Sequence, residues 1–319
     1  MNESPSAALE VPPTPTPSTN RFRVLAGAIA ALILFYSLPL LDLLKLATSS
    51  ELYSHVILVP FVTGYLIWLK RGELRGHSEP SRVTAMIAAL GGALLLITFW
   101  ILQHGIALTP DDRLALLISS FVLLVVAACA VLLGRQTLVA IAFPLGFLLC
   151  MVPFPTVVVH GIETFFQHTS AAAAAGFFEL ARTPFFREGT FFQLPGINLE
   201  VAPECSGIRS SLALFITSLV AGHLFLRSNY KRLLLVCVVI PLAILRNGLR
   251  IFVIGELCVH ISPDMIHSYI HRQGGPLFFG LSLIPFTLFL YLLVRSDRKK
   301  GPTQSPAKVS EEIISSPSP

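Results

Sequence analysis

The stretch "LEVAPECSGIRSSLALFITSLVAGHLF", residues 199–225, joins a cluster of reactive side chains to a long apolar segment. A glutamate, a cysteine, a serine, a glycine and an arginine fall between positions 204 and 209, whereas the part that follows is nearly free of charge. The apolar part is long enough to cross a bilayer as a helix, which needs roughly 17–25 residues. We therefore expect the reactive cluster to lie where a membrane helix begins.

The rest of the chain shares this apolar character. Of its 319 residues, 54% are hydrophobic and only 13% are charged, and the mean hydropathy is +0.73. Soluble domains carry about 25% charged residues, so this composition predicts an all-α polytopic membrane protein. The 23 basic residues exceed the 18 acidic ones, which in a membrane protein is explained by loop charge that sets orientation. Neither a glycine-rich phosphate loop nor a basic–aromatic nucleic-acid surface is present in the sequence.

The apolar runs divide the chain into about eight predicted membrane helices between two polar ends. Residues 1–20 are rich in Pro, Ser and Thr, and residues 296–319 in Lys, Ser, Pro and Glu; both predict disordered cytoplasmic tails. Residues 21–295 are then a single transmembrane catalytic domain. Its predicted spans lie near 24–41, 55–69, 83–102, 114–133, 136–152, 208–226, 232–253 and 276–294.

The distribution of Lys and Arg favours both termini in the cytoplasm, because most basic residues then lie in inside loops. Four of the exceptions, Arg209, Arg246, Arg250 and Arg272, fall near the outer ends of the late spans. Arginine at membrane depth is costly and generally marks function. Cys205 is predicted at the same level. We therefore expect a site on the outer face of the cytoplasmic (inner) membrane.

The segment between the fifth and sixth predicted spans is not a simple loop. Residues 160–181 are alanine-rich and helix-prone, and a helix here is compatible with crossing the membrane, lying in its interface or re-entering it. The charge bias favours a helix that does not cross. In residues 185–207, Gly189 and Pro195-Gly196 interrupt short β-like runs. They predict a small extracytoplasmic β-hairpin before Cys205.

Cys205 differs from the four other cysteines, which all lie within apolar runs. At the start of a helix, unpaired N–H groups and the helix dipole favour a thiolate, and Arg209 lies on the same helical face. The neighbouring carboxylate of Glu204 acts in the opposite direction. From the residues alone, a nucleophile and an inert interfacial cysteine both stay open.

Two further segments carry candidate groups. In "LRNGLRIF", residues 245–252, Arg246 and Arg250 share one helical face and either snorkel to headgroups or, with Asn247, bind a carbonyl or carboxylate. In "DMIHSYIHRQGGPLFFG", residues 264–280, His267 and His271 fit a proton carrier, a surface pair or two metal ligands. Further acidic and histidine side chains that could complete a metal site lie nearby: Glu256, His260 and Asp264. Weaker candidates elsewhere in the chain are His104, Asp111, Asp112, His160, Glu163 and His168.

Taken together, "LEVAPECSGIRSS", "RNGLRIF" and "HRQGGPLFFG" resemble, in order, the motifs of the exosortase/archaeosortase family of integral membrane cysteine transpeptidases. The resemblance covers the motif region 185–280. It implies Cys205 as the nucleophile, Arg250 as the essential arginine and His271 as the histidine, with no cofactor and no metal. The possible accessory residues are Glu204, Arg209, Arg246, Asn247 and His267.

The resemblance also implies a substrate. Exported proteins would carry a C-terminal tripartite sorting signal, made of a short PEP-like motif, a membrane helix and a basic cluster, and an acceptor nucleophile of unknown identity would resolve the acyl-enzyme. Membrane lipids are the other expected partner, and no nucleic acid is expected. Two alternatives stay open: a metal-dependent membrane hydrolase that uses His267 and His271, and a transporter with an anion pathway lined by arginines.

Overall fold

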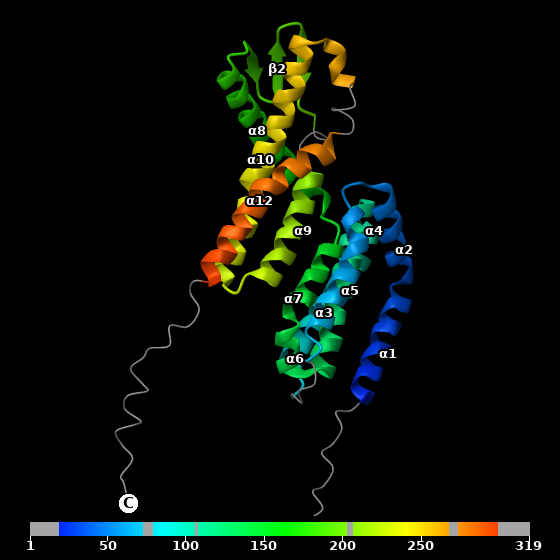
Figure 1. Ribbon diagram of the computed structural model, residues 1–319. Helices are drawn as coiled ribbons and strands as arrows, with labels where there is room; N and C mark the ends of the chain where they lie inside the picture. The colour runs from blue at the N-terminus through cyan, green and yellow to red at the C-terminus, as the bar shows by residue number, and fades with distance from the viewer. Residues whose placement is uncertain (1–18, 73–78, 106–107, 203–206, 268–273, 299–319) are drawn as a thin grey trace, which may run out of the picture. The chain divides into compact units, whose positions relative to one another are not determined.

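The computed structural model describes residues 19–72, 79–105, 108–202, 207–267 and 274–298 (Figure 1). The chain divides into two compact units, Met1–Val158 and Val159–Pro319, and each is described by itself. The limits predicted for one catalytic domain and two tails stay a prediction.

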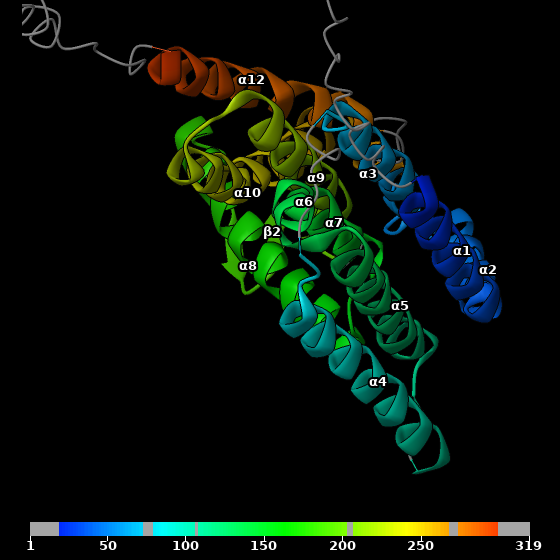
Figure 2. The same ribbon diagram turned by 90° about the horizontal axis from the view of Figure 1, so that it is seen from below.

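The first unit is entirely helical within its described residues. Helices α4 and α5 lie side by side in both views (Figures 1 and 2), and the Gly92 carbonyl of α4 accepts a hydrogen bond from the Ser120 hydroxyl of α5 (2.8 Å). The Tyr36 hydroxyl lies 2.7 Å from the same Ser120 oxygen. The elements are α1 (Thr19–Phe35), α2 (Ser37–Ser49), η1 (Ser54–Ile57), α3 (Leu58–Leu69), α4 (Arg82–Gly105), α5 (Pro110–Leu132), α6 (Gly134–Ala140), α7 (Ala142–Phe147) and η3 (Leu148–Met151).

Two of the predicted spans are bent. The axis turns by 72° between α1 and α2 and by 64° between α6 and the following helix Ala142–Met151. In each case a proline, Pro39 or Pro144, stands four residues after the last residue of the first helix. A proline ring clashes with the carbonyl four residues earlier and lacks the N–H that would bond it, so the helix breaks there.

The described residues contain five helices that are long and apolar enough to cross a membrane, and up to seven if each bent pair is one span. The predicted span near 55–69 corresponds to a shorter apolar helix, Ser54–Leu69. The multi-pass helical architecture is thus confirmed, and the number eight stays a prediction. The expected helix at 160–181 exists as α8 (Thr156–Ala181), which is not among the candidate spans.

The second unit combines helices with a small sheet. Strands β1 (Phe186–Glu188), β2 (Phe191–Leu194) and β3 (Ile197–Glu200) pair antiparallel in the order β1-β2-β3. The sheet has one strand more than the predicted hairpin, because Gly189 and Gly196 each form a turn at positive φ (61° and 82°). The helices are α8, α9 (Ile208–Phe225), α10 (Asn229–His260), η5 (Pro263–His267) and α12 (Gly275–Arg298).

Helix α10 connects two hydrophobic cores. Figure 1 shows the sheet and α8 beside its C-terminal half, and α9 and α12 along its N-terminal half. One core joins Leu235 and Val239 of α10 to α9 and α12. The other joins Ile251 to α8 and the sheet, with Phe178 and Phe192 fully buried at its centre. The α10 residues between these cores, 240–250, include the candidate arginines.

Candidate functional site

The structure describes the surroundings of the predicted nucleophile rather than the nucleophile itself. Glu204, Cys205 and His271, together with the side chain of His267, lie outside the described residues. Their predicted roles are therefore untested. The residues on both sides of the cysteine, and the three arginines predicted near it, are described.

The chain before the cysteine is anchored by the sheet and by α8. Val201 is 1% exposed, and its N–H donates a hydrogen bond to the carbonyl of Thr190 (3.1 Å). The side-chain amide of Gln167 in α8 donates to the Val201 carbonyl. The chain is therefore held in place at Val201, directly after β3 and two residues before position 203, where the description of the chain stops.

The chain after the cysteine is anchored at Gly207, the residue that precedes α9. Gly207 has φ of 75°, a left-handed conformation that favours glycine. A Cβ built on it would also lie 3.0 Å from Cγ and Oδ1 of Asn247, which is tighter than ordinary contact. The position thus requires glycine for two independent reasons, and the start of α9 rests directly on α10.

The carbonyl of Gly207 collects several donors. It accepts hydrogen bonds from the Ser211 N–H (3.0 Å), the Ser211 hydroxyl (2.7 Å), the Ser210 hydroxyl (3.2 Å) and Nη2 of Arg246 (3.1 Å). Nη2 of Arg246 also donates to the Ser211 hydroxyl (3.2 Å). The first turn of α9 is therefore tied to α10 through one guanidinium.

Arg246 is buried, at 6% exposure, and does not snorkel. Its Nη1 is buried with no hydrogen-bond partner among the described residues. The guanidinium is therefore placed inside the protein rather than at the lipid headgroups.

The other two arginines lie close by. Arg250 is one helical turn beyond Arg246, is half-buried, and is near enough to act electrostatically on both Arg246 and Arg209. Arg209 is exposed in the first turn of α9. The prediction that these three side chains gather at one place in the fold is consistent with these interactions.

A small cavity of about 30 Å³ lies between the end of β3 and the part of α10 that carries Arg250. A cavity needs about 10–15 Å³ by this measure to hold one water molecule, so this one is large enough for water. The Asn247 side chain lies against Gly207, after the cysteine, and Asn247 also lines this cavity together with residues that precede the cysteine. The residues that line the cavity are Leu199, Glu200, Val201, Asn247, Arg250, Ile251 and Ile254.

Two glycines on α10 permit close packing of α8. A Cβ on Gly248 would lie 2.6 Å from Cβ of Ala173, and one on Gly255 would lie 2.5 Å from Cζ of Phe178. These contacts hold α10 against α8, the helix that supplies Gln167 to the other side of the site. Sequence reasoning missed this support, although two glycines spaced seven apart opposite an alanine run were a visible signal.

The acidic and histidine neighbours proposed for a metal are engaged otherwise. Glu256 accepts a hydrogen bond from the Thr183 hydroxyl, and its second oxygen lies 3.0 Å from Nε2 of His260. Among the residues that the structure describes, no group of three or more His, Cys, Asp or Glu side chains is placed to hold a metal. The pair His267 and His271 is not tested, because both side chains are outside that set.

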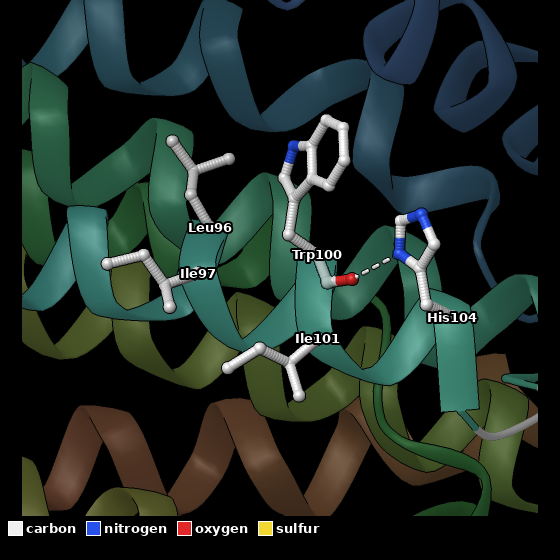
Figure 3. Close-up of a pocket in the computed structure, with 5 residues that line it drawn as sticks. All are labelled: Leu96, Ile97, Trp100, Ile101 and His104. Carbon is white, nitrogen blue, oxygen red and sulfur yellow. Dashed lines mark hydrogen bonds between the residues drawn. The ribbon is translucent and has the colours of Figure 1, made fainter.

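The weaker candidates lie in helices. His160, Glu163 and His168 belong to α8, where Nδ1 of His160 lies 3.5 Å from Oε2 of Glu163. His104 lies in the last turn of α4, where its Nδ1–H donates a hydrogen bond to the Trp100 carbonyl (2.7 Å) and its ring stacks on the Trp100 ring. Figure 3 shows this pair together with Leu96, Ile97 and Ile101 of the same helix. Asp111 and Asp112 lie in the first turn of α5, where the Asp112 carboxylate accepts hydrogen bonds from the N–H and the hydroxyl of Thr156.

Comparison with known proteins gives one match. The family model described as transmembrane exosortase matches residues 47–288, about three quarters of the chain. The matched region includes Gly207, Arg246, Arg250 and the sheet. Searches of curated proteins and of solved structures found no match.

Proposed function

Because the chain belongs to the transmembrane exosortase family, we propose that it is a membrane-embedded cysteine transpeptidase that cleaves the C-terminal sorting signal of exported proteins. The substrate signal is PEP-CTERM-like, with a short motif, a membrane helix and a basic cluster. The observation that carries the proposal is the contact of Arg246 and Asn247 with Gly207, two residues after Cys205.

In the proposed reaction the thiolate of Cys205 attacks the carbonyl carbon of the scissile peptide bond. A carbon–sulfur bond forms, and the carbonyl electrons move onto oxygen, where the Arg250 guanidinium donates hydrogen bonds to the oxyanion. Collapse of this intermediate breaks the carbon–nitrogen bond. His271 protonates the leaving amine, and a thioester remains on the enzyme.

The second half of the reaction releases the product. His271 removes a proton from the acceptor nucleophile, which attacks the thioester carbonyl, and Cys205 leaves as the thiolate. Transfer to an acceptor amine or hydroxyl gives a transpeptidation or ester product, whereas water gives hydrolysis. Three accessory candidates are close in sequence to these residues: Glu204 and Arg209 flank Cys205, and His267 precedes His271 by four residues.

Chain connectivity supports the assignment of Arg250. Two residues of chain span at most about 7 Å, so Cys205 is tethered close to the contact between Gly207 and Asn247. Arg250 lies three residues after Asn247 on the same helix, and residues i and i+3 are neighbours on a helix surface. This connectivity supports the proposal that Cys205 and Arg250 act at one reaction centre.

The proposed membrane arrangement is the one that the charge distribution favours. Eight spans place both termini in the cytoplasm and the site at the outer face of the cytoplasmic (inner) membrane. A sorting signal with a cytoplasmic basic cluster then presents its cleavage motif at the level of Cys205.

The first test combines labelling and processing. A membrane-impermeant maleimide is applied to spheroplasts that express wild type, Cys205→Ala or Arg250→Ala, together with a reporter that carries a C-terminal sorting signal. We expect labelling that depends on Cys205, and loss of reporter cleavage in both variants despite wild-type protein levels.

Three outcomes would contradict the proposal. Normal cleavage by stable Cys205→Ala excludes the thiol mechanism, and normal cleavage by Arg250→Ala excludes the oxyanion role. Labelling only after lysis reverses the topology. Adding a chelator in a parallel experiment distinguishes the metal-dependent hydrolase. That alternative predicts that chelation stops reporter cleavage and that thiol alkylation does not.

A further inference from the structure

The buried guanidinium of Arg246 is the strongest feature that the proposed reaction does not use. A buried cation is costly unless it is paired, and the acceptors that it has among the described residues are neutral, the Gly207 carbonyl and the Ser211 hydroxyl. Removal of such a group leaves both acceptors without this donor. We therefore expect a role of Arg246 in the site beyond filling space between the helices.

The geometry of these bonds couples two helices at the site. The Gly207 carbonyl is also the acceptor of the first α9 backbone hydrogen bond, from the Ser211 N–H. Arg246 thus acts on the backbone at the start of α9, while Asn247 lies against Gly207 from the same turn of α10. Arg250 is carried by the next turn of that helix.

We propose that Arg246 is a positioning residue that holds the start of α9 in register with Arg250. The inference rests on the proposed function, because register matters only if Cys205 and Arg250 act on one carbonyl. In this role Arg246 acts through Gly207 rather than on the reacting atoms. Its Nη2 binds the Gly207 carbonyl, two residues after Cys205 in the sequence, and Arg250 follows on the next turn of α10.

The chain offers a matched control on the same helix. Nε of Arg232 donates to the Leu226 carbonyl (3.0 Å), and its Nη1 lies 3.2 Å from Oδ1 of Asn229. Leu226 follows α9 directly, so Arg232 ties the end of α9 to α10 as Arg246 ties its start. Arg232 is far along the helix from Arg250 and from the cysteine segment. A purely structural role predicts similar effects for the two arginines.

The experiment compares Arg246→Met with Arg232→Met in the full chain in native membranes. Steady-state processing of the reporter gives kcat and KM, and maleimide labelling of Cys205 against pH reports the state of the thiol. Misplacement by about 1 Å can cost about 100-fold in rate, so we expect kcat to fall about 100-fold in Arg246→Met with little change in KM. In Arg232→Met, kcat should stay within about threefold of wild type.

A variant that keeps the charge separates position from electrostatics. Gly207→Ala displaces the same contact without removing the arginine. We expect it to lower kcat, and we expect the double variant with Arg246→Met to be no slower than the slower single variant, because both changes disrupt one contact. If Arg246→Met does not fold, Arg246→Lys and Ser211→Ala replace it, and each should lower kcat by a smaller factor.

The outcomes distinguish the two proposals. If Cys205→Ala is inactive while Arg246→Met keeps wild-type kcat, the positioning role is wrong and the transpeptidase proposal stands. Equal losses in Arg246→Met and Arg232→Met, or losses that multiply in the double variant with Gly207→Ala, also overturn the positioning role. Wild-type processing by Cys205→Ala removes the proposed function itself.

Discussion

The two ends of the α9–α10 pair use the same bond for different purposes. At one end, Arg232 donates to the carbonyl that follows α9, and at the other, Arg246 donates to the carbonyl that precedes it. The Arg232 end is also supplied with a carboxylate. Asp297 of α12 accepts from the Arg227 N–H (2.7 Å) and from Lys231 (3.0 Å).

At the other end, the acceptors of Arg246 among the described residues are a carbonyl and a hydroxyl, and Arg250 lies near enough to act electrostatically on Arg246 and on Arg209. Cationic donors of this kind are suited to a negative charge that develops during a reaction. The difference fits our proposal, with assembly at the first end and chemistry at the second.

The largest effect should come from Arg250→Lys. An ammonium cannot reproduce the planar fork of donors, and loss of one oxyanion donor costs about 10²–10³-fold in kcat. Arg232→Lys is the control, because a single donor to one carbonyl is enough there. Reporter processing measures both variants. Normal turnover by Arg250→Lys would show that the end with Arg246 and Arg250 also serves only assembly.

Gly207→Ala should have the next largest effect, this time on stability. Left-handed backbone costs an alanine about 1–2 kcal/mol, and the new methyl group meets buried Asn247 at 3.0 Å. Gly222→Ala is the matched control near the other end of α9, where a Cβ meets its nearest neighbours at 3.7 Å. Alanine favours the helix interior by about 1 kcal/mol, so this variant should be as stable as wild type or more stable.

Thermal unfolding of the purified protein in detergent measures this pair of variants. We expect a lower melting temperature for Gly207→Ala and an unchanged or higher one for Gly222→Ala. If both variants melt alike, the contact between the start of α9 and Asn247 is not the constraint that the geometry indicates.

The smallest effect should come from Asp297→Asn. The amide keeps an acceptor for the Arg227 N–H but loses the ion pair with Lys231. Because both side chains are only 13% exposed, loss of the pair should lower the melting temperature. We expect kcat to stay within about twofold of wild type, because the pair lies at the opposite end of α9 from Arg246. A large loss of kcat would mean that the two ends are coupled, and would remove the division between assembly and chemistry.

Local patterns in the sequence predicted the membrane class and the position of the sheet. Gly189 and Pro195-Gly196 marked both turns, and only the number of strands differed. The bends after α1 and α6 were also visible in the sequence, because Pro39 and Pro144 break the helices there. They were missed because each proline lies within a long apolar run that was interpreted as one straight span.

The support of the site was not predictable in the same way. Gly207 and Arg246 are 39 residues apart, so no local pattern reports their bond. An arginine near a helix end is compatible with snorkelling, and only the packing of α9 against α10 decides that Arg246 is buried. Gln167 reaches Val201 for a similar reason, through the approach of α8 to the sheet.

The arginine–carbonyl bonds at the two ends also have a mechanical consequence. A slide of α9 along α10 by one residue, about 1.5 Å, would strain the bonds of Arg232 and Arg246 at the same time. The two helices are therefore expected to move as one rigid pair. For the proposed transmembrane substrate, we expect access through movement of other helices, with the register of α9 and α10 unchanged during turnover.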